Sequence, residues 1–346
     1  MTTQRLEWID ALKCFLITIV IWGHLIQYYS GKVHFWENPI WEIIYSFHMP
    51  LFIFISGYLF KNKSNLSNSI RIKTIQLLLP GLTCATILYI KDVDLNQIKL
   101  IDIKHIFESS CLNLWYLKVL FICLMGGYIF FRSKLICIVS FIIFWLFIRL
   151  GFYDYININL LNLLCSAIGG GNGLFFLLPF FVLGYCFRYY NLYRIFCKKV
   201  FIISSLSIWY ILMLYFEGPD TIYFASAKWF SSGILLYKEI TQTIYRDLVA
   251  LFAIIFLSVI FRRYYSSTHI YQLIDKTVRD IGRNTLGIYI LQYLIIEMNL
   301  INFSLYTFCP NNYSCAVISV LIVLLFNQFV KIIQMNKYIS TLLIGG

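Results

Sequence analysis

Apolar runs close to the length of a membrane span recur along the whole chain. About 20 apolar residues are needed for a helix to cross the hydrocarbon core of a bilayer. The chain has 346 residues, of which 60% are hydrophobic and only 13% are charged. Soluble domains carry roughly 25% charged residues. The sequence therefore predicts an all-α, polytopic transmembrane helical bundle that forms one domain over residues 1–346.

Hydropathy predicts about ten spans. They cover residues 11–29, 40–60, 75–90, 114–131, 135–150, 174–187, 199–216, 246–262, 284–300 and 315–331. The loops 91–113 and 217–245 are the longest on one side. Long loops often bind ligands, so these two are candidates for contact with an acceptor.

The 28 Lys and Arg residues fall mostly in alternate loops. Because cytoplasmic loops of membrane proteins are enriched in basic residues, this places both termini in the cytoplasm. Arg246 is assigned to the opposite, outer side. The net charge of +12 is interpreted as this orientation signal and not as a nucleic-acid interface. The lipid bilayer is thus the expected partner, and the sequence gives no oligomeric state.

The ten cysteines contain no Cys-x-x-Cys pair, so we expect neither a metal site nor a redox motif. Cys309 and Cys315 flank one short loop. They would form a disulfide if that loop faced an oxidising compartment.

Two histidines lie inside apolar segments near the N-terminus. Ionisable groups in the hydrocarbon core are costly and usually functional. His24 and His48 are in consecutive predicted spans, at similar expected depth. The pair predicts a proton-transfer site within the membrane. The alternative for each histidine is a structural role, with the ring bonded to a backbone carbonyl or a hydroxyl.

Lys13 precedes His24 by eleven residues, or about 16 Å along a helix. It is expected near the cytoplasmic face, at the depth of Ser56 and Gly57 on the next span. The alternative for Lys13 is a lysine that extends to the interface. Arg71 and Lys73 in the following inner loop would add positive charge at the same face.

Aromatic and polar residues at the outer ends of later spans are candidates for binding an acceptor. Trp115 and Tyr116 open the fourth span, with Lys118 just after them, and Glu297 is near the outer end of the ninth. Aromatic faces with polar edges suit a carbohydrate. The alternative is an interfacial aromatic belt with an extended lysine.

Five segments in series resemble the acyltransferase-3 family of bacterial membrane acyltransferases, closest to its fucose 4-O-acetylase-like, surface-polysaccharide O-acetyltransferase group. They are Trp8 to Lys13 with His24, Phe47 to Tyr58, Leu114 to Leu117, Pro179 to Gly184, and Thr285 to Leu291. Each motif alone is weak, but together they span residues 8–292 in the family's order, and about ten spans is the family's architecture.

The resemblance implies residue roles. His24 matches the histidine taken as catalytic, Lys13 matches the basic residue that contacts the acetyl-CoA donor, and His48 matches a second recurrent histidine. Ser56 and Gly57 match the family's serine-glycine turn. Two departures stand out. The family often has Arg at the position of Lys13, and many members have His at the position of Gln292.

The function expected from residues and resemblance together is O-acetylation of a cell-surface or exported glycan from cytoplasmic acetyl-CoA, in the bacterial inner membrane. His24 would be general base or acyl carrier, and His48 would position it or the acceptor. Lys13, Arg71, Lys73 and Ser56 would hold the donor, and no metal is expected. The alternative is a transporter or flippase for a lipid-linked saccharide, which the lack of inverted-repeat symmetry disfavours.

Overall fold

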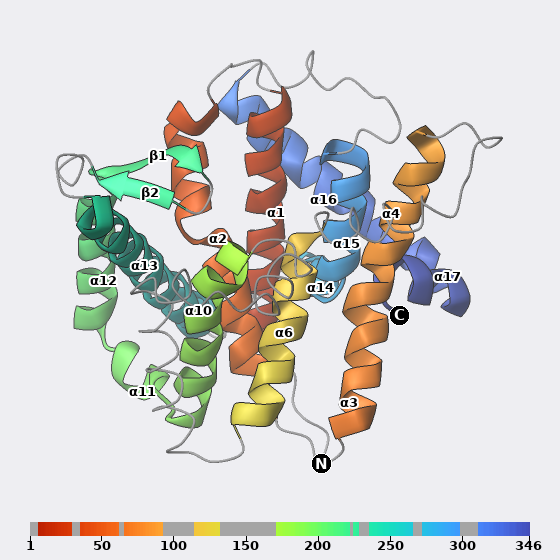
Figure 1. Cartoon of the computed structure of the whole chain (residues 1–346), viewed down its shortest axis with the longest axis horizontal. Coiled ribbons are helices and arrows are strands. Elements are labelled where there is room, and N and C mark those ends of the chain that lie inside the picture. Colours follow the sequence, from red (N-terminus) through yellow and green to blue (C-terminus); the bar gives the residue numbers. More distant parts are fainter. Residues whose placement is uncertain are drawn as a thin grey trace.

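The computed structural model confirms the all-α bundle (Figure 1). It describes residues 6–29, 35–61, 66–92, 114–131, 171–221, 224–227, 235–265, 272–297 and 311–346. Five helices in these ranges are long and apolar enough to cross a membrane, and the chain is a membrane protein. They are Glu7–Tyr28, Pro39–Leu59, Leu66–Ile90, Ile244–Tyr265 and Asn312–Gln334. Shorter apolar helices lie between them.

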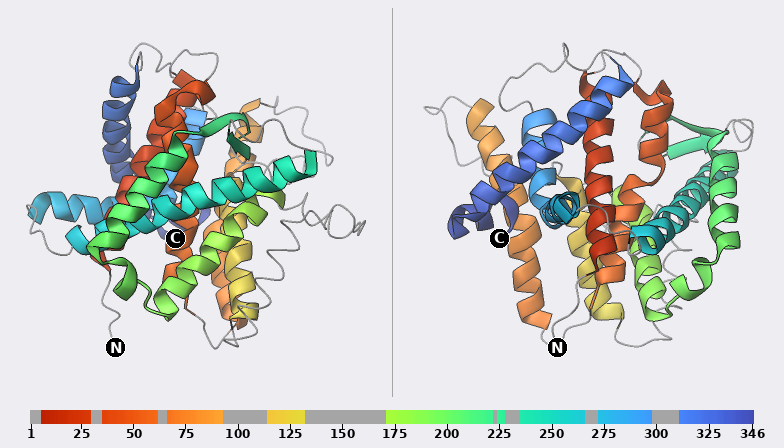
Figure 2. Two further views of the ribbon diagram at one scale, coloured as in Figure 1. Left: turned by 90° about the vertical axis from the view of Figure 1, so that its left-hand side faces the viewer. Right: turned by 180° about the vertical axis from the view of Figure 1, so that it is seen from behind.

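Among the described residues, the N-terminal half contains four long helical segments that pass up and down the bundle (Figures 1 and 2). Their elements are α1 (Glu7–Tyr29), the short 3-10 helix η1 (Phe35–Glu37), α2 (Pro39–Leu59), α3 (Leu66–Lys73), the π-helical turn η2 (Thr74–Leu78), α4 (Leu79–Asp92) and α6 (Trp115–Phe130). Asn38 caps α2 by accepting from the backbone N–H of Ile40 at 3.0 Å, a favoured arrangement at a helix start.

The C-terminal half adds further helices and one hairpin. Its elements are α10 (Gly171–Tyr189), α11 (Tyr193–Phe196), α12 (Lys199–Met213), β1 (Phe216–Thr221), β2 (Phe224–Ala227), α13 (Leu235–Ile260), η5 (Phe261–Tyr265), α14 (Gln272–Arg283), α15 (Thr285–Gln292), η6 (Tyr293–Glu297), α16 (Asn312–Gln334) and α17 (Lys337–Ile344). The antiparallel pair β1–β2 lies in the loop predicted over 217–245, where the hydropathy reading gave no strand.

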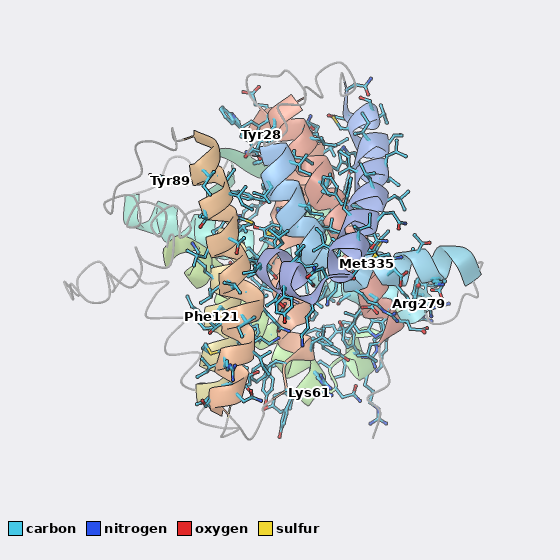
Figure 3. The ribbon with its side chains drawn as sticks, turned by 90° about the vertical axis from the view of Figure 1, so that its right-hand side faces the viewer. Tyr28, Lys61, Tyr89, Phe121, Arg279 and Met335 are labelled. Carbon is cyan, nitrogen blue, oxygen red and sulfur yellow. The ribbon has the colours of Figure 1, made fainter. Side chains whose placement is uncertain are left out.

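Each predicted span that falls in the described residues contains a helix, while the span predicted over 135–150 lies outside them. Hydropathy missed α14 and α17. The polar α14 lies across the direction of α1 (Figures 2 and 3), and its Arg279 forms an ion pair with Glu7. Arg283 lies 3.8 Å from the buried carboxylate of Asp10. The beginning of α1 is therefore tied to a helix that was predicted as part of a loop.

The α2 and α10 backbones pack tightly against each other, and two glycines permit this contact. A Cβ at Gly57 would lie 1.8 Å from the carbonyl oxygen of Phe181, and one at Gly184 would lie 2.0 Å from that of Phe54. Small residues let helix backbones approach in membranes. Gly57 therefore faces α10, while its neighbour Ser56, on a different side of the helix, faces a cavity.

Basic residues from several predicted cytoplasmic loops meet at one end of the bundle. Arg188 donates to the backbone oxygen of Tyr58 at 3.1 Å, and Arg262 donates to its hydroxyl at 3.0 Å. Figure 3 places Lys61 at this end and Tyr28 at the opposite one. The arrangement agrees with the alternation of loops on which the predicted orientation is based.

Candidate active site

A cavity of about 120 Å³ lies between α1, α2, α6 and α15. Most of its wall is apolar. The apolar lining residues are Ile17, Val20, Met49, Phe52, Leu117, Leu120 and Leu286. Polar side chains enter it from all four helices, and these are Lys13, Ser56, Tyr116, Thr285 and Tyr289. Such a mixture of apolar walls and few polar groups is typical of a small-molecule site.

Three residues predicted from sequence meet in this cavity: Lys13, Ser56 and Tyr116. The Ser56 hydroxyl donates to the carbonyl oxygen of Phe52 at 3.0 Å, and the Phe52 ring lies 6.2 Å from that of Tyr116. The Tyr116 ring also contacts Tyr289, with ring centroids 6.1 Å apart. Tyr116, predicted to open the fourth span and to contact an acceptor, lines the same cavity as Lys13.

His24 lies on the same side of α1 as the residues that line the cavity. Lys13, Ile17 and Val20 line the cavity, and His24 follows Val20 by four residues. Spacings of three and four residues keep side chains on one face of a helix. His24 therefore lies on the same face as Lys13, one turn beyond the lining residues and toward the end of the bundle marked by Tyr28 (Figure 3).

The two predicted histidines flank one tyrosine. The ring of Tyr45 lies 6.3 Å from that of His24 and 4.6 Å from that of His48, both in edge-to-face geometry. His24 is half-buried and stacks on Tyr28 with centroids 6.0 Å apart, whereas His48 is buried. Tyr45 therefore contacts both imidazoles across the α1–α2 packing, and their matched depth stays a prediction.

His48 has a defined tautomer. Its Nδ1 lies 2.8 Å from the carbonyl oxygen of Ile44. Because a carbonyl only accepts, Nδ1 carries a proton in this contact. When the ring is neutral, Nε2 then keeps its lone pair. The backbone bond is the one that a structural histidine would make, and it also orients the free nitrogen.

Arg246, counted on the outer side from the sequence, is buried within α13. This helix begins at Leu235, eleven residues before the predicted span. The guanidinium of Arg246 lies 4.1 Å from the centroid of the Phe176 ring. It is also close enough to His48 for a Coulomb interaction, as is His24. The sequence indicated a role for Arg246 only in that a charged residue stands at the edge of an apolar run.

The remaining predicted residues do not line the cavity. Trp115 and Lys118 are half-buried on α6. Arg71 is exposed on α3, and Lys73 of the same helix donates to Gln76 Oε1 at 2.8 Å. Glu297 is the last residue of η6, with its side chain outside the described part. Cys309 also lies outside it, so the pairing with Cys315 stays a prediction.

Comparison with known families matches residues 6–329 to the acyltransferase-3 model, described as an acyltransferase domain. The chain belongs to the acyltransferase-3 family. This confirms the resemblance, and the protein is accordingly a membrane-bound acyltransferase. The match covers all four helices that line the cavity, together with both histidines.

Two curated relatives are nodulation proteins named NolL. The one from Mesorhizobium japonicum is 44% identical over 85 residues, 23% of this chain and 23% of the relative. The one from Sinorhizobium fredii is 40% identical over 84 residues, 22% of this chain and 23% of the relative. The matched part thus spans less than a quarter of the relatives' length. No solved structure matches the chain.

Proposed function

We propose that this acyltransferase moves an acetyl group from cytoplasmic acetyl-CoA to a hydroxyl of a cell-surface or exported glycan. The observation that carries the proposal is the shared face of α1. Lys13 and three neighbouring helices form a cavity along this face, and His24 lies just beyond it. The cation at the predicted cytoplasmic end suits the phosphates of the donor. The imidazole farther along the helix suits the thioester at the donor's other end.

The donor would lie with its phosphates at the cytoplasmic end. Lys13 is a cation that lines the cavity, and Arg71 and Lys73 on α3 add positive field without lining it. The extended pantetheine arm would follow the apolar wall, past Ser56, across the roughly 16 Å from Lys13 to His24. The apolar lining would exclude water from the thioester and so limit its hydrolysis.

In the chemical step, the acetyl group moves from the sulfur of CoA to the hydroxyl oxygen of the acceptor. His24 accepts the proton of the acceptor hydroxyl as its oxygen attacks the thioester carbonyl. The carbon–sulfur bond then breaks, and the proton passes to the departing CoA thiolate. As an alternative route, His24 is first acylated, CoA leaves, and the hydroxyl attacks the acyl-imidazole. His48, with its defined tautomer, would orient His24 or the acceptor.

The acceptor would approach from the end opposite the basic cluster. Tyr28, at that end (Figure 3), has 36% of its surface exposed and stacks on the ring of His24. Trp115, Lys118 and Glu297 remain proposed acceptor contacts, and Tyr116 would contact the reacting groups from within the cavity. Since the relatives come from rhizobial bacteria, the bacterial inner membrane is the proposed location.

The proposal is tested with purified protein in nanodiscs and radiolabelled acetyl-CoA, with and without candidate surface glycans. Release of CoA with label in the glycan is expected for the wild type. His24→Ala should lower transfer by at least about 100-fold, the usual contribution of a general base. His269→Ala, a histidine outside the predicted spans, is the matched control. Full activity of folded His24→Ala would exclude the assignment, and no donor binding by the wild type would exclude acetyl-CoA.

A further inference from the structure

Tyr45 contacts three residues that lie in two consecutive turns of α1. Its hydroxyl donates to Gln27 Oε1 at 3.0 Å, and its ring contacts that of His24. A Cβ at Gly23 would lie 2.9 Å from Tyr45 Cε2, which is too close for an undisturbed ring. The ring therefore occupies a notch in α1 that exists because residue 23 is glycine.

On its own helix, Tyr45 is held from both sides. The ring stacks on Trp41, one turn earlier, with centroids 4.0 Å apart and planes inclined by 22°. One turn later it meets the edge of His48. Spacings of −4 and +3 place all three rings on one face of α2. Both Trp41 and Tyr45 are buried, so the stack has little room to rearrange.

We propose that Tyr45 is a positioning residue of this site: its ring, lodged against Gly23, fixes the orientation of both His24 and His48 across the α1–α2 contact. The inference rests on the acetyl transfer proposed above. The hydroxyl points to Gln27 and has no part in the reaction, because the orienting contacts with the imidazoles are made by the ring. Loss of the ring should therefore lower the rate, whereas loss of the hydroxyl should not.

Four variants separate this role from general destabilisation. Tyr45→Leu removes the ring, Tyr45→Phe keeps it, and Gly23→Ala pushes it out of its notch. Phe47→Leu is the matched control. Phe47 is buried on the same helix, but its ring meets Trp209 of α12 at 5.6 Å and not an imidazole.

Kinetics on folded protein give the first measurement. We expect Tyr45→Leu to lower kcat about 100-fold, the usual effect of misplacing a catalytic group by about 1 Å. KM for acetyl-CoA should change little. Gly23→Ala should lower kcat by a smaller factor, while Tyr45→Phe and Phe47→Leu should stay within about threefold of the wild type. Equal losses for Tyr45→Leu and Phe47→Leu, or full activity of Tyr45→Leu, would overturn the positioning role.

A second measurement does not depend on activity. The folded full-length protein is treated with diethyl pyrocarbonate and then digested. Mass spectrometry of the peptides measures how far each histidine has been modified. Tyr45→Leu should make His48 several-fold more reactive, and Phe47→Leu should not. If this pattern appears but the wild type transfers no acetyl group, the proposed donor or acceptor is wrong while the contact of Tyr45 with the imidazoles stands. If the two variants react alike, the positioning role is wrong whatever the activity.

Discussion

Lys13 lines the cavity, and as a lysine it binds phosphate differently from arginine. An ammonium acts as a compact point charge, whereas a guanidinium presents a planar fork that matches two phosphate oxygens. The long stem of Lys13 can extend along the apolar cavity wall while its charged end reaches the cytoplasmic mouth. A lysine at this position therefore suits charge attraction more than geometric recognition.

We expect Lys13→Ala to raise KM for acetyl-CoA at least about tenfold, because a charge-assisted contact contributes about 1.5–3 kcal/mol. Lys13→Arg should keep or lower that KM. Steady-state kinetics at fixed acceptor measure both. Lys199→Ala, a change of an exposed lysine on α12, is the control and should leave the KM unchanged. A Lys13→Ala effect confined to the acceptor KM would contradict the role.

Single residues of the site were predictable to the extent that their chemistry is unusual in a membrane. Lys13, His24 and His48 are ionisable groups in or next to apolar runs, which is why sequence alone singled them out. Tyr45 is an aromatic residue among many, so nothing in its chemistry distinguished it. Its role depends on the notch at Gly23, a contact between two helices that no single segment reveals.

At the scale of elements, the packing of α2 on α10 determines which residues of α2 can face the cavity. Gly57 and Gly184 bring the two backbones into contact. The side of α2 that includes Ser56 and Phe52 is then left for the cavity. Hydropathy predicted both helices, but not the direction in which each glycine faces.

Gly57→Ala and Gly184→Ala should each prevent normal folding, because the new methyl group would overlap a backbone carbonyl that cannot move independently. We expect little monodisperse protein by size-exclusion chromatography in detergent. In α4, Gly81 has open space where a Cβ would be, and Gly81→Ala should match or exceed wild-type thermal stability, by up to about 1 kcal/mol. Wild-type behaviour of Gly57→Ala would show that the two helices are farther apart.

The polar helix α14 joins α1 to α16 through ion pairs. Lys331 of α16 donates to Asp280 Oδ2 at 2.8 Å. This bond lowers the pKa of the Asp280 carboxyl below its usual value of 3.8. Because the folded-state pKa is the lower one, the stabilisation is present above about pH 4 and is lost as the pH falls through the folded-state value.

Asp280→Asn should lower stability at pH 7 by at most about 1 kcal/mol, since Lys331 is partly exposed and such pairs are screened by solvent. At pH 3 the difference from wild type should shrink, because the wild-type carboxyl is then becoming protonated as well. Thermal denaturation in detergent at both pH values measures this. A difference of equal size at pH 3 and pH 7 would show that the ion pair is not its cause.

At the scale of the whole molecule, long apolar segments predicted the bundle because lipid requires every backbone polar group to be bonded within a helix. Hydropathy could not predict polar segments in the same way, because water can bond their backbone groups and no helix is required. The helix α14 and the strand β1 have polar sequences, and their structures depend on contacts with the bundle. The first residues of α13 are also too polar for a hydropathy window. The predicted span therefore begins later than the helix that contains the buried Arg246.

The orientation of the molecule decides whether Lys13 faces the compartment that contains CoA. An epitope tag inserted after Tyr190, an exposed residue of the α10–α11 turn, should be cytoplasmic. A tag in the loop predicted over 217–245 should be outside. In spheroplasts, antibody should therefore label the second tag directly and the first only after permeabilisation. Both insertions should retain activity as evidence of folding. The opposite labelling pattern would place Lys13 on the outer side, where no CoA is available, and would contradict the proposed direction of transfer even if His24 remained essential.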